Sequence, residues 1–180
     1  MRLRKDTSIA IIGAGIGGLA IAAALRQAGI DSIVYEQAET FARVGAGIQQ
    51  SPNAMKVHRG LGIEVQLRDL GFAPTSSLNR DAISGKVTND HPLGRAVEER
   101  YGAPYLTLHR GDLHAALAGI VPADTIMHGK KLVRITEHGR RMTLAFAGGG
   151  TGEADLVIGA DGAHSLVREH LAGPEQPRFT

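Results

Sequence analysis

The sequence contains no cysteine and no tryptophan, and aromatic residues make up only 4% of its 180 residues. Without cysteine, the chain cannot form a disulfide framework, a thiolate nucleophile or a cysteine-ligated metal centre. This is the composition we expect of a cytoplasmic protein. With so few aromatic side chains, the protein also lacks the stacking surface that single-stranded nucleic acids require.

An excess of charge of one sign is missing as well. The 20 Lys and Arg residues nearly balance the 18 Asp and Glu residues, and the net charge is +2. So small a charge, scattered without a basic run, does not indicate a nucleic-acid partner. The hydrophobic share of 43% and the charged share of 21% are typical of a soluble globular protein of ordinary domain size.

The longest uncharged stretch, residues 9–25, follows Arg2, Arg4 and Lys5, as a signal peptide or membrane span would. It is shorter than the roughly twenty residues that a span needs, and four of its residues are glycine. A second apolar run with an acidic end follows it. We therefore expect no membrane association.

What the sequence has in plenty is glycine, and three glycines form the motif G-x-G-x-x-G at Gly13, Gly15 and Gly18. An apolar run at residues 8–12 precedes the motif, and the Ala- and Leu-rich residues 19–27 follow it. A second apolar run, residues 30–35, ends at the acidic Glu36. This order predicts strand, turn, helix and strand, the context in which the motif indicates a dinucleotide site.

Each of these residues has an expected task. Gly13 allows the tight turn out of the strand, Gly15 lets the backbone approach a pyrophosphate, and Gly18 lets the helix pack closely on the sheet. The first amides of the helix would face the phosphates. Glu36 would accept hydrogen bonds from a ribose diol and repel a 2′-phosphate, which disfavours NADP at this position.

The middle of the chain predicts a long loop and several short elements. Residues 37–50 are interpreted as a loop that carries Arg43, and Ser51-Pro52 starts the first of two short helices separated near residues 60–62. Their expected core positions are Met55, Val57, Leu61, Val65, Leu67 and Leu70. Residues 72–91 predict a hairpin that turns at Ser84-Gly85, followed by a charged helix at 93–101, a strand at 105–109 and a helix at 110–117.

The last third predicts short strands at residues 125–128, 132–136 and 141–146, the last two joined by a hairpin at 137–139. A second strand, turn and helix follow at residues 156–158, 159–163 and 165 onward, with Asp161 on the turn. In a doubly wound sheet such strand ends share one ligand crevice. The expected fold is therefore α/β and Rossmann-like, with a parallel central sheet, helices on its faces and a smaller antiparallel region.

Two other interpretations of the polar residues are weaker. Asp161, His164 and Ser165 lie too close together in sequence to form a catalytic triad, and no G-x-S-x-G is present. His109 and His114 do not have the i, i+4 spacing of a helical metal pair, and no acidic cluster accompanies them. We expect no metal site.

Several motifs together resemble those of the single-component FAD-dependent aromatic hydroxylases, the salicylate and p-hydroxybenzoate hydroxylase family. They are the glycine motif with Glu36, Arg43 with G-A-G-I at 45–48, S-P-N-A at 51–54, H-R-G-D-L at 109–113, and A-D-L-V-I-G-A-D-G-A-H-S-x-V-R at 154–168. Within that family, P-L-G at 92–94 and residues 101–114 are most similar to 6-hydroxynicotinate 3-monooxygenases.

The resemblance implies a set of FAD contacts. The three motif glycines would hold the pyrophosphate, Glu36 with its neighbour Gln37 would lie at the adenosine ribose, and backbone groups near Leu132 would touch the adenine end. Arg43, Gln49 and Arg110 would lie along the cofactor, and Asp161 would face the pyrophosphate.

In such enzymes NADH or NADPH reduces the flavin, oxygen adds to give a flavin hydroperoxide, and one oxygen atom passes to an activated aromatic acid. The implied partners are thus FAD, a nicotinamide cofactor and a small aromatic acid, with no nucleic acid or membrane. The protein supplies position and electrostatics.

The sequence departs from the family at two places. The 6-hydroxynicotinate enzymes carry a histidine, proposed as a base, where this chain has Gln49, and glutamine cannot accept a proton at working pH. A salicylate-type substrate therefore remains equally open. A later G-D motif is absent, so we interpret residues 1–172 as an FAD-binding domain with an excursion at 72–104, and residues 173–180 as the start of a substrate domain.

Two alternatives remain open on the residues alone. One is an NAD-linked dehydrogenase built on the same opening unit, and the other is a flavin- or nucleotide-binding fragment without turnover. We expect that the 180-residue chain by itself does not hydroxylate.

Overall fold

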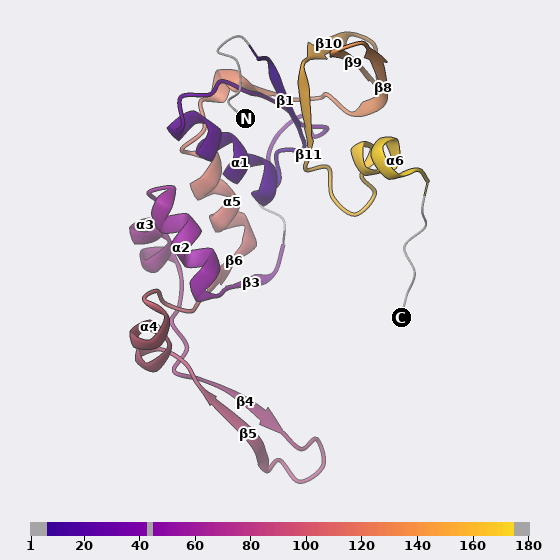
Figure 1. Cartoon of the computed structure of the whole chain (residues 1–180). Coiled ribbons are helices and arrows are strands. Elements are labelled where there is room, and N and C mark those ends of the chain that lie inside the picture. The colour runs from indigo at the N-terminus through magenta and orange to yellow at the C-terminus, as the bar shows by residue number, and fades with distance from the viewer. Residues whose placement is uncertain (1–6, 43–44, 175–180) are drawn as a thin grey trace. The chain divides into compact units, whose positions relative to one another are not determined.

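The computed structural model describes residues 7–42 and 45–174. The described residues form two compact units, residues 7–42 with 117–174, and residues 45–116. Figure 1 shows the elements along the chain. The predicted α/β class with a parallel sheet is confirmed.

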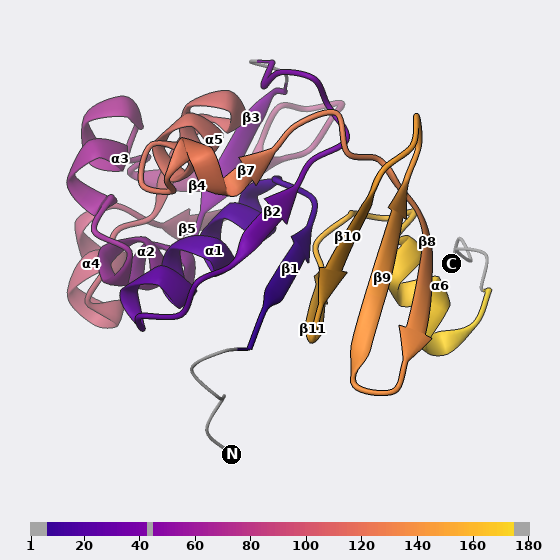
Figure 2. The same cartoon turned by 90° about the horizontal axis from the view of Figure 1, so that it is seen from above.

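The first unit is built on the predicted strand, turn, helix and strand. Its elements are β1 (Ile9–Ile12), α1 (Ile16–Gln27), β2 (Ile33–Tyr35), the 3-10 turn η1 (Ala123–Thr125), β7 (Ile126–Met127), β8 (Leu132–His138), β9 (Arg141–Phe146), β10 (Thr151–Ala154), β11 (Leu156–Gly159) and α6 (Leu166–Ala172). Four strands pair in parallel in the order β11-β1-β2-β7, and β10-β9-β8 form an antiparallel sheet. Figure 2 shows the two sheets, with α6 beside the antiparallel one.

The core of this unit lies between the two sheets. Because strand side chains alternate between faces, Ala10 and Ile12 of β1 point to the same side. There they pack with Tyr35, Leu144 and Phe146. The opposite face of β1 and β2 is equally buried, and the small and apolar residues of α1 pack on these strands. The central strand β1 is thus covered on both faces, as its continuous apolar sequence requires.

The second unit is mainly helical. Its elements are β3 (Gly47–Gln50), α2 (Pro52–Gly60), α3 (Glu64–Leu70), β4 (Ser76–Arg80), β5 (Val87–Pro92), α4 (Arg95–Tyr101), β6 (Leu106–His109) and α5 (Arg110–Ala118), whose last turn extends into the first unit. Strand β3 pairs antiparallel with β6, and β4 with β5. The predicted hairpin, short helices and later strands are confirmed.

The structure corrects some details of the second unit. The predicted loop at 37–50 ends in a strand, because residues 47–50 pair with β6. Ser51 occupies the N-cap of α2, but its side chain makes no capping hydrogen bond. Val57, Val65 and Leu70 are exposed rather than in the core.

Helical geometry explains the error at Val57. Residues three apart share a face of a helix and residues two apart do not. Because Met55 faces the core, His58 faces the core as well and Val57 faces solvent. Met55 and His58 are accordingly buried, at 0% and 4% exposure. The apolar pattern alone did not reveal the buried histidine.

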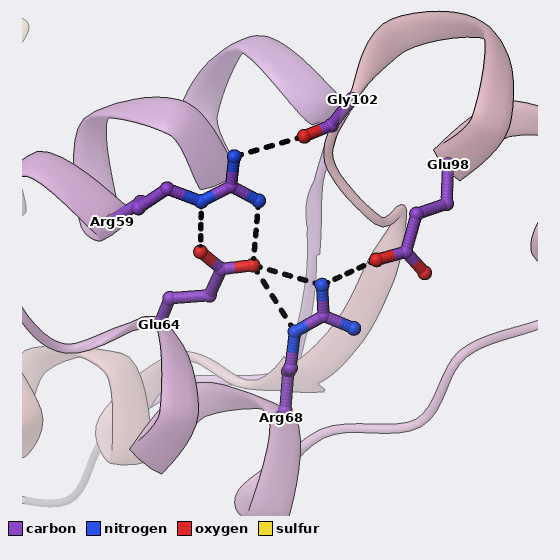
Figure 3. Close-up of polar contacts among 5 residues, drawn as sticks. All are labelled: Arg59, Glu64, Arg68, Glu98 and Gly102. Carbon is purple, nitrogen blue, oxygen red and sulfur yellow. Dashed lines mark hydrogen bonds and ion pairs between the residues drawn. The ribbon is translucent and has the colours of Figure 1, made fainter.

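A network of ion pairs joins α2, α3 and α4, as Figure 3 shows. The Glu64 carboxylate accepts hydrogen bonds from both Arg59 and Arg68, and Arg68 also reaches Glu98 at 2.5 Å. Arg59 further donates to the carbonyl oxygen of Gly102 at 2.9 Å. The two guanidinium groups hold the pKa of Glu64 at about 2. The network fastens the helix that follows the hairpin to the other two.

Candidate functional site

Two glycines of the opening motif are required by the protein's own packing. Gly13 has φ +99°, and a methyl group placed on it would lie 2.4 Å from the carbonyl oxygen of Ala160. A methyl group on Gly18 would lie 1.9 Å from the carbonyl oxygen of Gly13. The absence of a side chain at Gly13 lets the turn after β1 pack against the turn after β11. The absence of one at Gly18 lets α1 pack against the turn after β1. Both agree with the packing roles expected from the sequence.

The third motif glycine, Gly15, and the neighbouring Gly17 are not required by internal contacts. Among the described residues, a methyl group on Gly15 or Gly17 would meet no atom within 4 Å, and Gly15 has an ordinary φ of −71°. Gly15 is the N-cap of the twelve-residue helix α1, has no side chain to cap it, and is followed by no acidic residue in the first turn. An unobstructed, uncapped helix start of this length fits a pyrophosphate, because its free amides and dipole favour an anion.

Glu36 ties the end of β2 to this turn. One carboxylate oxygen accepts a hydrogen bond from the backbone N–H of Ala14 at 2.7 Å, and the other accepts one from the N–H of Ala38 at 2.8 Å. Each oxygen has a second lone pair with which it can accept a hydrogen bond from a ribose hydroxyl. Gln37, the next residue, is exposed at the first bend after the strand.

The segment after Glu36 is held by the connection between β7 and β8. The N–H of Glu36 donates to Met127 at 2.9 Å, and its carbonyl oxygen accepts from the N–H of Lys130 at 2.7 Å. The N–H of Gly129 donates to Ala38 at 3.2 Å. These contacts join segments about ninety residues apart, and no local sequence signal marks them.

Two aromatic rings extend this contact. The ring of Phe41 meets the imidazole of His128 edge to face at 4.7 Å, and the imidazole lies 3.1 Å from the carbonyl oxygen of Ala38. Leu132 begins β8 just beyond, with its side chain buried at 8% exposure. Hydrogen bonds and a ring contact thus hold together Glu36, Gln37 and the backbone before Leu132 in the first unit.

Asp161 caps helix α6. One carboxylate oxygen accepts from the Ser165 hydroxyl at 2.5 Å, and the other accepts from the N–H groups of Leu166 and Val167 at 2.7 and 3.3 Å. A methyl group on Gly13 would lie 3.2 Å from the Cα of Asp161, so the two turns are in contact. The meeting of the two strand ends was expected from the sequence. The Asp161–Ser165 hydrogen bond serves the cap.

Two further predicted residues lie in the second unit. Arg110 is the exposed first residue of α5, its N–H donates to Ala46 at 3.0 Å, and its side-chain carbons lie beside Gly45. Gln49 is exposed on β3. Arg43 lies outside the described residues. The structure thus places Arg110 beside the glycine-rich segment that precedes Gln49.

The second unit also contains a buried polar pair that sequence reasoning missed. His58 on α2 and Gln50 on β3 are 4% and 6% exposed, and the His58 Nε2 lies 2.8 Å from the Gln50 Oε1. Burial lowers the pKa of His58. The only signal in the sequence was the spacing of His58 from Met55.

Residues 7–42 and 45–174 contain neither a metal-binding cluster nor a helix that could span a membrane. His109 accepts a hydrogen bond from the N–H of Gly111 at 3.1 Å, which serves the start of α5. No group of three or more His, Asp or Glu residues in these ranges is placed to hold a metal ion. No helix in the same part of the chain has the length and apolar character needed to cross a bilayer.

Comparison with known proteins identifies the family of the chain, and the turn from Gly13 to Gly18 is called the cradle below. Residues 6–178 match the model of an FAD binding domain. The chain belongs to this FAD-binding domain family. The turn between Gly13 and Gly18 fits the cofactor, because the glycine positions that pack against protein and those that leave open space are both present.

Relatives of this FAD-binding domain include several named monooxygenases. It is 46% identical over 177 residues to a 6-hydroxynicotinate 3-monooxygenase from Pseudomonas fluorescens, covering 98% of this chain and 46% of the relative. It is 42% identical over 175 residues to a 3-amino-4-hydroxybenzoate 2-monooxygenase from Streptomyces cremeus, covering 97% and 44%. The chain therefore spans less than half the length of these relatives.

Among solved structures, the domain is similar to Klebsiella pneumoniae HpxO complexed with FAD and uric acid. The TM-score is 0.86 at 31% identity, and the match covers 98% of this chain and 45% of that one. The likeness supports the assignment of the fold as well as the family.

Proposed function

We propose that this chain is the FAD-binding part of a flavin-dependent monooxygenase that hydroxylates an aromatic or N-heteroaromatic acid, using NADH or NADPH and molecular oxygen. The observation that carries the proposal is the open cradle at Gly15 and Gly17, bordered by the Asp161 turn and by Glu36. We place the protein in the cytoplasm and in the breakdown of aromatic compounds.

In this proposal the chain's own residues bind and orient the cofactor. The first amides of α1 hold the pyrophosphate, since no side chain caps them. Glu36 accepts from the adenosine ribose while its hydrogen bonds to Ala14 and Ala38 keep the carboxylate in place. Asp161 holds the second turn through its cap on α6.

Arg110, Arg43 and Gln49 supply the remaining proposed contacts. Arg110 supplies a positive charge along the cofactor, and Gln49 supplies a neutral hydrogen-bonding group on the substrate side. Gln49 cannot accept a proton, so it orients an aromatic acid without acting as its base. The bound flavin supplies the redox chemistry and the activation of oxygen.

The substrate class rests on the relatives. The enzymes named above act on 6-hydroxynicotinate and 3-amino-4-hydroxybenzoate, both small aromatic acids. Because Gln49 replaces the histidine expected of the first group, salicylate-type acids are candidates beside 6-hydroxynicotinate.

Flavin retention tests the cofactor assignment. The purified chain should be yellow and should release FAD on denaturation. Gly15→Val should abolish FAD retention, because its side chain would occupy the cradle without meeting protein atoms. Gly60→Val, which also adds a side chain in open space, is the control and should retain FAD. A folded Gly15→Val protein with unchanged flavin content would contradict the assignment.

A second experiment tests the reaction. In the protein that carries this chain, NADH or NADPH oxidation should be stimulated by 6-hydroxynicotinate or salicylate, with a hydroxylated product found by mass spectrometry. A colourless protein that binds NAD and oxidises an alcohol would instead support the dehydrogenase.

A further inference from the structure

The buried pair His58 and Gln50 continues to the backbone of Gln49. The side-chain N–H of Gln50 donates to the carbonyl oxygen of Gln49 at 2.8 Å, which leaves the Gln50 Oε1 as the acceptor toward His58. His58 must therefore carry its proton on Nε2 and have an unprotonated Nδ1. The three residues form one directed chain of hydrogen bonds from α2 to the outer edge of β3.

Strand pairing explains why Gln49 needs this support. Gln49 lies opposite Thr107 of β6, but both backbone groups of Thr107 bond to Phe72 on its other side. Gln49 is thus in a non-hydrogen-bonded pair, and its N–H and C=O face away from β6. The side-chain amide of Gln50 donates to the carbonyl oxygen of Gln49, which in a wider sheet would accept a hydrogen bond from a further strand.

The arrangement is not what stability alone would favour. The Nδ1 of His58 is buried without a hydrogen-bond partner among the described residues, and a buried polar atom left unsatisfied is destabilising. Two apolar side chains of similar size would avoid that penalty, because replacing both partners of a buried hydrogen bond is often nearly neutral. The polar pair therefore calls for a role other than packing.

We propose that His58 is a positioning residue which, through the side-chain amide of Gln50, fixes the backbone of Gln49 and so directs its exposed side chain toward the cofactor and substrate. This rests on the proposed function, in which Gln49 contacts FAD. The Gln49 side chain points away from the core because Gln50 points into it. Fixing one residue of this strand therefore sets the direction of the other.

The test is a double-mutant cycle on FAD affinity, read by quenching of flavin fluorescence. His58→Leu/Gln50→Leu removes the hydrogen-bond chain and keeps the core apolar. We expect the free energy of unfolding in urea to be unchanged or raised, and the Kd for FAD to rise about three- to tenfold, as the loss of one oriented hydrogen bond would produce. Gln49→Ala should weaken FAD binding similarly.

Adding the double replacement to Gln49→Ala should then cause no further loss of FAD affinity, since His58 and Gln50 act through Gln49. His58→Gln, which retains an N–H donor, should recover most of the affinity. Met55→Leu, a buried replacement on the same helix, is the packing control and should leave the Kd unchanged.

The outcomes separate the two proposals. A wild-type chain that does not bind FAD would refute the proposed function. A wild-type chain that binds FAD, together with a folded double variant of equal affinity or with fully additive losses, would refute the positioning role alone. A loss of stability without a change in affinity would also refute it.

Discussion

At the scale of single residues, the glycines of residues 13–18 divide into two kinds. Gly13 and Gly18 are needed because protein atoms occupy the place of a side chain, whereas Gly15 and Gly17 face open space. The first kind determines whether the turn folds, and the second leaves room for a ligand. The glycine motif thus meets two separate requirements, close packing within the protein and open space for a ligand.

Gly18→Ala should lower the free energy of unfolding by about 2–3 kcal/mol, because its methyl group would overlap backbone atoms that cannot move cheaply. Gly17→Ala, one residue away in α1, should instead raise it by about 0.5–1 kcal/mol, as alanine does in an open helix position. Urea unfolding measures both. Equal effects of the two replacements would contradict the packing around Gly13.

His58 should make stability depend on pH. Burial lowers its pKa in the folded chain, while an unfolded histidine takes up a proton near pH 6.5. The unfolded state therefore binds more protons as the pH falls below about 6.5, and the stability advantage of the neutral histidine is lost in that range.

Urea unfolding of the wild type and of His58→Leu/Gln50→Leu at pH 7.5 and 5.5 measures this dependence. The wild type should lose stability relative to the double variant on acidification. The other histidines are common to both proteins and cancel in the comparison. Parallel losses would show that His58 does not titrate as its burial requires.

At the scale of elements, the second unit joins short helices by charge as well as by apolar contact. Glu64, with a side chain 12% exposed, lies between two arginines that are more exposed. Isolated surface ion pairs contribute little, but here one carboxylate is shared by two guanidinium groups from different helices. Figure 3 shows that the network also reaches α4 through Glu98 and Gly102.

Glu64→Gln should lower the free energy of unfolding by about 1–2 kcal/mol at neutral pH. The folded pKa of about 2 lies below the unfolded value of 4.5, so the contribution is complete above the unfolded value. It disappears as the pH falls toward 2. Urea midpoints between pH 7 and 2 measure it, with Glu99→Gln, in the exposed pair with Arg95, as the control. A difference that persists at pH 2 would contradict the ionic account.

At the scale of the whole molecule, the candidate FAD contacts are distributed over both units. The motif glycines, Glu36, Gln37, Leu132 and Asp161 lie in the first, and Gln49 and Arg110 lie in the second. A ligand that binds only the folded chain stabilises it by mass action. Parts of FAD should therefore report on the units separately.

FAD at a hundredfold excess over its Kd should stabilise the chain by about 2.7 kcal/mol. ADP should also raise the melting temperature, because the proposed contacts of the cradle and Glu36 are with the ADP half of the cofactor. Riboflavin, which lacks it, should raise the temperature less. NADP should be the weakest dinucleotide, since its 2′-phosphate would face Glu36. Thermal unfolding with each compound tests this order, and a greater shift with NADP than with FAD would contradict the role of Glu36.

Much of the fold followed from local pattern. The order of apolar runs, the glycine turn, the hairpin at Ser84-Gly85 and the turn at Asp161 were predictable, because turn chemistry and side-chain periodicity act within a few residues. The exposure of Val57 and the strand at 47–50 were not predictable in this way. Which side of α2 faces inward, and which partner β3 finds, depend on residues distant in the sequence.

The spacing of Gly13, Gly15, Gly18 and Glu36 is enough to predict a nucleotide-binding turn, because each residue's expected task depends only on its place in a local strand, turn and helix. Only the tertiary structure decided what surrounds it. The contact of Gly13 with the turn at Asp161, the fastening of Glu36 by Met127 and Lys130, and the chain from His58 to Gln49 all join separate segments. Hydrogen bonds and close packing between such segments form only when the whole chain folds, so no local pattern contains them.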